Sequence, residues 1–170
     1  MTVDEIFAEL KKHALEGMVF HDMMARYYDF LGLRHEKDRH ERQYYGETEG
    51  YRDLCSYYMG HYNRFIPETK MDQPVVIPET WYRYKRQEVD VGTKTSAVKA
   101  GVRKWVEWEQ ATKQLYEDMT KELIDIGETA AARFLSSYVK AVDDELCEAE
   151  RKQINLEAIN YDLAVIILGV

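Results

Sequence analysis

The chain has 170 residues, of which 45% are apolar and 32% are charged. This balance excludes an intrinsically disordered chain and a collagen-like fibre, and the length predicts a single domain over residues 1–170. The formal net charge of −8 disfavours general binding to the phosphates of nucleic acids.

The first predicted helix spans about residues 3–31. Thr2 and Glu5 have the spacing of a capping box at its start, and Gly32 supplies a left-handed stop at its end. Its apolar residues alternate in steps of four and three, as expected for a helix that buries one face, and His21 lies on this stripe.

A second helix is predicted over about residues 35–65, followed by a segment that contains all three prolines of the chain, Pro67, Pro74 and Pro78. Because proline breaks the interior of a helix, residues 67–94 are expected to form a long connection. A connection of this length fits a compact domain if it crosses a bundle to join two helices that run the same way.

The third helix is predicted to begin with Thr95 or Ser96 as its N-cap and to end at Gly127. The fourth begins near Thr129 and its apolar stripe continues to Leu163. The short turns after the first and third helices require antiparallel hairpins, so the sequence predicts an all-α four-helix bundle with one long crossover between helices two and three. The predicted core positions include Leu54, Trp105, Met119, Leu135 and Val142.

Each predicted helix carries a polar residue on or beside its apolar stripe. Glu109 and Glu145 both lie about 18 residues from Gly127, roughly 27 Å along the helix axis. Glu16 and Glu47 lie about 15 residues from the turn that follows the first helix, so all four can meet near the middle of the bundle. Carboxylates brought together in a medium of low dielectric constant need a cation or a shared proton.

These positions predict a metal site in the bundle core. The candidate ligands are Glu16, His21, Glu47, Glu109, Glu145 and Glu148, and the tyrosines expected to line the site are Tyr44, Tyr51 and Tyr138. The alternative is that the inner glutamates bond tyrosine hydroxyls, Lys152 or a neutral histidine without any metal.

Short motifs resemble the ferritin-like superfamily of di-iron carboxylate four-helix bundles. The motifs are Leu15-Glu16 followed by Tyr27-Tyr28, Trp108-Glu109-Gln110 followed by Leu115-Tyr116-Glu117, and Phe134-Leu135 at the start of the fourth helix. The long crossover also fits the family. The resemblance implies a ferritin-like bundle in which Glu16 and Glu109 bind iron.

The motif Glu-x-x-His, which the family carries on its second helix, is degenerate here. Glu47 is followed three residues later by Gly50, and the fourth helix offers Glu145-x-x-Glu148. Imidazole and carboxylate together suit iron, whereas a purely carboxylate site favours harder ions such as Mn²⁺, Mg²⁺ or Ca²⁺. The resemblance implies Fe, whereas the carboxylate donors favour an ion such as Mn, so the expected metal is Fe or Mn, bound as one or two divalent ions with redox or storage activity.

A second hypothesis is a non-enzymatic, acidic interaction or inhibitor protein on the same bundle without a functional metal site. Its partner is expected to be a second copy or another protein. The longest apolar run, residues 163–170, is too short to cross a bilayer, so no membrane association is expected. The absence of a signal-peptide pattern at Met1 and the two isolated thiols, Cys55 and Cys147, indicate a cytoplasmic protein.

Overall fold

The computed structural model describes residues 1–169, which contain helices and turns but no strand. The long helices are α1 (Val3–Leu31), α2 (Arg34–Tyr62), α3 (Val91–Asp125) and α4 (Thr129–Ala158), and the short helix α5 spans Leu163–Ile167. This confirms the predicted all-α class. Val170, which ends the apolar run of the sequence, lies outside the described residues.

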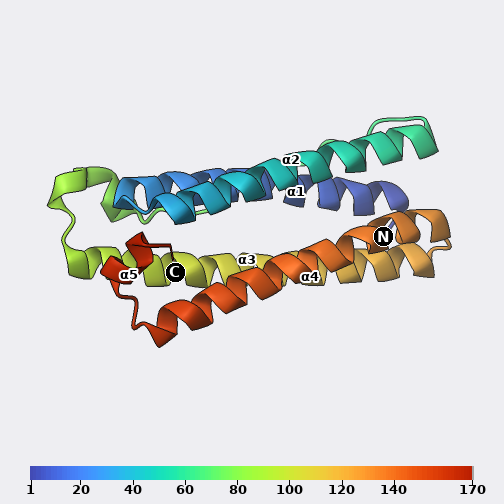
Figure 1. Ribbon diagram of the computed structural model, residues 1–170. Helices are drawn as coiled ribbons and strands as arrows, with labels where there is room; N and C mark the ends of the chain where they lie inside the picture. The colour runs from blue at the N-terminus through green and yellow to red at the C-terminus, as the bar shows by residue number, and fades with distance from the viewer. Residues whose placement is uncertain (170) are drawn as a thin grey trace.

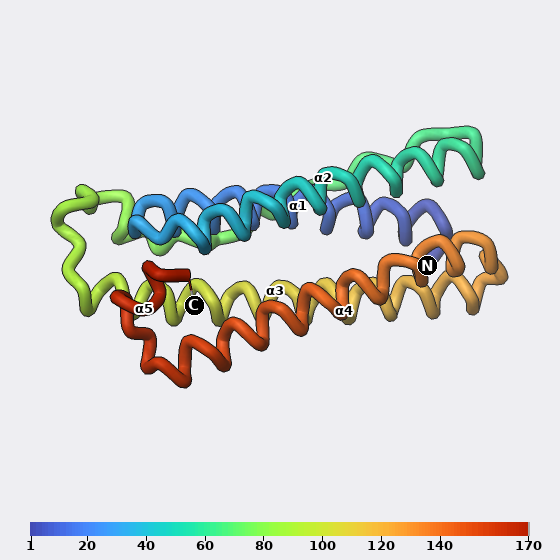
Figure 2. Tube along the Cα trace, viewed as in Figure 1, coloured from blue at the N-terminus to red at the C-terminus, as the bar shows by residue number. Residues whose placement is uncertain are grey.

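The four long helices form two antiparallel hairpins, α1 with α2 and α3 with α4, which lie on top of each other (Figure 1). Across the hairpins, α1 packs mainly against α3. The chain leaves α2 at one end of the bundle, returns along its length and begins α3 at the opposite end (Figure 2). The connection between α2 and α3 is therefore the predicted crossover, and it includes two short 3-10 turns.

The start and end of α1 follow the sequence signals. The Thr2 hydroxyl accepts a hydrogen bond from the backbone N–H of Glu5 at 3.3 Å, and the Glu5 carboxylate accepts one from the backbone N–H of Thr2 at 2.7 Å. Gly32 ends the helix with a φ of 77°, a left-handed conformation that favours glycine. The predicted capping box and stop are thus confirmed.

Two helix boundaries next to the crossover differ from the prediction. Helix α2 ends at Tyr62, because Asn63 adopts a left-handed conformation and its N–H bonds the Met59 carbonyl. Helix α3 begins earlier than Thr95, since Asp90 is its N-cap and accepts a hydrogen bond from the backbone of Thr93 at 2.7 Å. The crossover therefore spans residues 63–90 instead of 67–94.

The fourth long helix is shorter than predicted. Helix α4 ends at Ala158, and positive φ angles at Asn160 and Tyr161 turn the chain before α5 begins. Leu163 thus belongs to α5, which packs against α3. The apolar pattern continues across this break because both segments cover the same end of the core.

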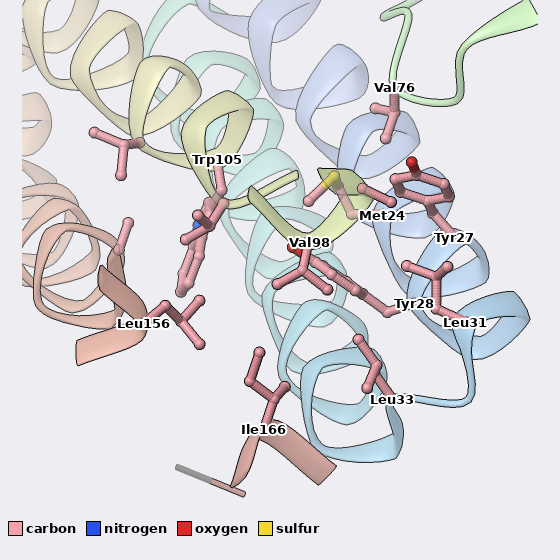
Figure 3. Close-up of a cluster of buried hydrophobic side chains, with 14 of the residues drawn as sticks. Met24, Tyr27, Tyr28, Leu31, Leu33, Val76, Val98, Trp105, Leu156 and Ile166 are labelled. Carbon is pink, nitrogen blue, oxygen red and sulfur yellow. The ribbon is translucent and has the colours of Figure 1, made fainter. Parts of the chain in front are cut away.

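The hydrophobic core consists of two clusters at opposite ends of the bundle. Figure 3 shows the first, in which Trp105 and Val98 of α3 face Leu156 of α4 and Tyr28 of α1, with Ile166 of α5 beside them. The second cluster joins the N-terminal half of α1 to the C-terminal half of α2 and to the turn between α3 and α4. The predicted core residues Leu54, Trp105, Met119, Leu135 and Val142 are all buried, which confirms the helical phases.

The helices of residues 1–169 include none with an apolar stretch long enough to cross a membrane.

Candidate metal centre

The polar stripe residues lie between the two apolar clusters. On α3, Glu109 follows the last residues of the first cluster and precedes Met119 of the second. On α4, Glu145 falls between Leu135 and Leu146 in the same way. The predicted mid-bundle position therefore corresponds to a gap in the hydrophobic core.

Glu109 is the most buried carboxylate of this region, with 1% of its surface exposed. Its Oε1 accepts a hydrogen bond from the Trp105 indole at 2.8 Å, whereas its Oε2 is buried and has no partner among the described residues. Burial, followed by the charge of Glu145, raises the pKa of Glu109 to about 8. Glu109 is therefore mostly protonated at neutral pH.

Two further carboxyl groups, on neighbouring helices, also have raised pKa values. Burial, then the charges of Glu145 and Glu109, raises the pKa of Glu47 well above its ordinary value. Burial, then the charge of Glu148, raises the pKa of Glu145 as well. The structure thus brings Glu47, Glu109 and Glu145 within electrostatic range of one another, on α2, α3 and α4.

The absence of a side chain at Gly17 leaves space for the Glu47 carboxyl group against α1. A Cβ atom at residue 17 would lie 2.7 Å from both Cδ and Oε1 of Glu47, closer than real contacts allow. The missing side chain lets a carboxyl group of α2 reach the backbone of α1. This close approach was not predicted, although a glycine on an apolar stripe is a signal for one.

His21 lies next to Glu109, and His40 contacts His21. The Nδ1 atoms of His21 and His40 are 3.1 Å apart, and His21 Nε2 lies 3.6 Å from Glu109 Oε1. Burial lowers the pKa of His21 to about 3 and lowers that of His40 well below its ordinary value, so both imidazoles are neutral. His40 was not among the predicted site residues, because it lies about two turns from Glu47; the spacing of seven residues nevertheless places both on the same face of α2.

Glu16 and Glu148 lie in other surroundings. Glu16 Oε1 accepts a hydrogen bond from the backbone N–H of Asp72 in the crossover at 2.8 Å, so Glu16 is not joined to the three central carboxyl groups. Glu148 forms an ion pair with Arg39, and both line an opening of about 220 Å³ together with Glu145. The opening connects Glu145 to the surface between α2 and α4.

The three predicted tyrosines contact other groups. The Tyr138 hydroxyl donates to Asp53 at 2.8 Å, the Tyr44 ring meets the ring of Tyr45 with centres 5.5 Å apart, and Tyr51 lies beside Cys55. Tyr116 of α3 is the tyrosine that faces the central carboxyl groups. Its pKa is raised by burial and then by the charges of Glu47, Tyr138 and Glu145. Its place on the predicted apolar stripe was a signal for this position.

The carboxyl groups do not form a ready-made cage. In the part of the chain that the structure describes, no three His, Cys, Asp or Glu side chains are close enough together to hold a metal ion. Lys152, the other partner considered for the inner glutamates, lies 2.6 Å from Glu36. The donor types nevertheless suit a hard cation, because they are carboxylates and one of their oxygens is unpartnered.

Comparison with known proteins identifies the architecture through structure alone. No protein-family model and no curated protein matches the chain. A humanized archaeal ferritin superposes with a TM-score of 0.80 at 16% identity, over 97% of this chain and 90% of that one.

Two other solved structures have the same architecture. A ferritin from Archaeoglobus fulgidus, engineered into a closed form, superposes with a TM-score of 0.80 at 14% identity, over 99% of this chain and 93% of that one. A PmFTN variant soaked in iron gives a TM-score of 0.76 at 11% identity, over 96% and 93% of the two chains. The chain therefore has the ferritin-like fold, an all-α four-helix bundle with one long crossover between α2 and α3.

Proposed function

We propose that the protein binds a divalent metal ion between Glu47, Glu109 and Glu145. The observation that carries this proposal is Glu109 Oε2, a buried carboxyl oxygen without a partner among residues 1–169. Buried polar atoms are normally hydrogen-bonded, so an orphaned oxygen beside two other carboxyl groups suits a cation. A cation would also stabilise the ionised forms of all three groups, which burial disfavours.

The donor set favours Mn²⁺ as the bound ion, and Fe²⁺ is the second ion to test. Three carboxylates are hard oxygen donors, and the position that would supply a histidine after Glu47 is Gly50. An iron-soaked protein among the structures with the same fold supports iron as one of the ions to test. The bound metal would supply one-electron redox chemistry or be held as cargo.

Binding is expected to displace protons and to move side chains. Glu109 is protonated at neutral pH, so a cation must replace its proton. The three carboxyl groups must also converge, because no three-ligand group exists in the described arrangement. Metal binding should therefore release protons and raise the melting temperature of the bundle.

The test is metal binding by protein prepared without a metal-binding tag. Titration of the chelator-treated protein with Mn²⁺, and with Fe²⁺ under anaerobic conditions, should give saturable binding with proton release and an increase in the melting temperature. Glu109→Gln should abolish binding while the helical circular dichroism is retained. Glu107→Gln, on the exposed side of the same helix, is the matched control and should bind as the parent does.

A parent protein that binds neither ion, in titration or by elemental analysis, would refute the metal site. The alternative of a non-enzymatic, acidic interaction protein would then be the better hypothesis, and Glu109 would act as a protonated core residue.

A further inference from the structure

The contact between His21 and His40 joins two nitrogen atoms that can share only one proton. Their Nδ1 atoms are 3.1 Å apart, and a neutral imidazole has one N–H donor and one bare acceptor nitrogen. One histidine must therefore donate from Nδ1 while the other accepts at Nδ1. The choice between these arrangements also decides which histidine carries a proton on Nε2.

The surroundings of Glu109 determine that choice. In a protonated carboxyl group the carbonyl oxygen is the better hydrogen-bond acceptor. Oε1 of Glu109 accepts the hydrogen bond of the Trp105 indole at 2.8 Å, so Oε1 is assigned as the carbonyl oxygen, which presents lone pairs to its neighbours. His21 Nε2 lies 3.6 Å from the same atom. A bare nitrogen at this position would face the lone pairs of the oxygen, whereas an N–H group would be attracted to them.

We infer that His40 is a positioning residue, which donates from Nδ1 to His21 and thereby fixes His21 with its proton on Nε2, directed at Glu109. The Nε2–H of His21 then faces the carboxyl group of Glu109, and its Nδ1 accepts the hydrogen bond from His40. Neither nitrogen of His21 is left to bind a metal. The packing around His40 holds this arrangement in place. His40 is fully buried, stacks on Tyr28 with ring centres 5.4 Å apart, and meets the edge of Trp105 at 5.0 Å.

This arrangement assigns different roles to the two oxygens of Glu109. Trp105 and His21 are both directed at Oε1, while Oε2 is the atom without a partner. In the proposed metal site, on which this last step rests, Oε2 would be the ligand atom and Oε1 would be held by the two ring N–H groups. Groups that orient a ligand in this way are normally needed for full affinity.

The direct test needs no metal. Long-range ¹H–¹⁵N correlation spectra of the chelator-treated, ¹⁵N-labelled protein report which nitrogen of each imidazole carries the proton. We expect His21 to be protonated on Nε2 and His40 on Nδ1. A spectrum with His21 protonated on Nδ1 and bare at Nε2 would overturn the inference, and it would leave His21 available as a metal ligand.

Variants of His40 test the positioning role. His40→Asn keeps an N–H donor near the position of Nδ1 and should retain the His21 tautomer, whereas His40→Leu should give a mixture of both tautomers. The control is His13→Asn, because His13 is a partly buried histidine of the same helix as His21 but bonds Thr112 at 2.7 Å. An unchanged His21 tautomer in a folded His40→Leu variant would refute the role of His40.

Metal affinity separates this inference from the proposed function. His40→Leu should weaken Mn²⁺ binding about tenfold, and His40→Asn should restore most of that loss. If the parent binds no metal, the proposed function fails while the tautomer spectra still decide the inference. If His40→Leu does not fold, the spectrum of the parent remains decisive.

Discussion

Replacing Glu109 with glutamine should make the free energy of unfolding less sensitive to rising pH. Burial and the charge of Glu145 raise the pKa of Glu109 from 4.5 to about 8. Between these values the folded protein retains a proton that the unfolded chain has released, so the free energy of unfolding falls with increasing pH. The slope for one such proton is about 1.4 kcal/mol per pH unit. Glutamine has a similar volume and no charge, so the variant lacks this contribution.

The Glu109→Gln variant should still lose stability as the pH falls, as the parent does. Burial lowers the pKa of His21 from 6.5 to about 3. As the pH falls through this range, the unfolded chain takes up a proton that the folded protein excludes, so stability is lost toward low pH. This loss does not depend on the Glu109 charge. The variant should therefore reach its maximum stability at a higher pH than the parent.

The assay is urea unfolding of the chelator-treated proteins at about pH 5, 6.5 and 8, values that sample both titration ranges. Glu107→Gln provides the control, because Glu107 is exposed and pairs with Arg103 at 2.9 Å on the surface of α3. The control should follow the parent within about 0.5 kcal/mol. If Glu109→Gln showed the same loss between pH 6.5 and 8 as the parent, the carboxyl group would not hold its proton there, and the reasoning would be refuted.

Three further outcomes are expected. Leu135→Ala should lower the free energy of unfolding by about 2–5 kcal/mol, because Leu135 is buried in the second apolar cluster, and an unchanged denaturation midpoint would contradict that packing. Gly17→Ala should displace the carboxyl group of Glu47, since the added Cβ atom would lie 2.7 Å from it. Mn²⁺ titration of this variant should show weakened binding, and unaltered affinity would show that Glu47 is not a ligand. Asp90→Ala should cost about 1 kcal/mol in urea unfolding by removing the N-cap of α3, and a helix that truly began at Thr95 would be insensitive to it.

Local signals in the sequence determined the helices and most of the core. A capping box and a left-handed glycine fix the limits of α1, and the spacing of apolar residues identified Trp105 and Leu135 as buried. These features depend on interactions within about one helical turn or on a repeat every 3.6 residues, both of which can be counted along the chain. Three boundaries of the long helices differ from the sequence prediction. They depend on the backbone conformation of single residues such as Asp90 and Asn63, which the spacing of apolar residues does not indicate.

The tertiary structure alone decided which polar residues face one another. Successive residues on a helix point about 100° apart, so the apolar stripe places Gly17 inward and Glu16 to one side, but it does not show which side chain of α2 lies against either residue. The packing of α1 turns Glu16 toward the crossover and lets the carboxyl group of Glu47 lie against Gly17. The His21–His40 contact depends in the same way on how α1 and α2 are rotated about their axes. Such rotations follow from the packing of side chains on neighbouring helices, which the sequence of one helix does not contain.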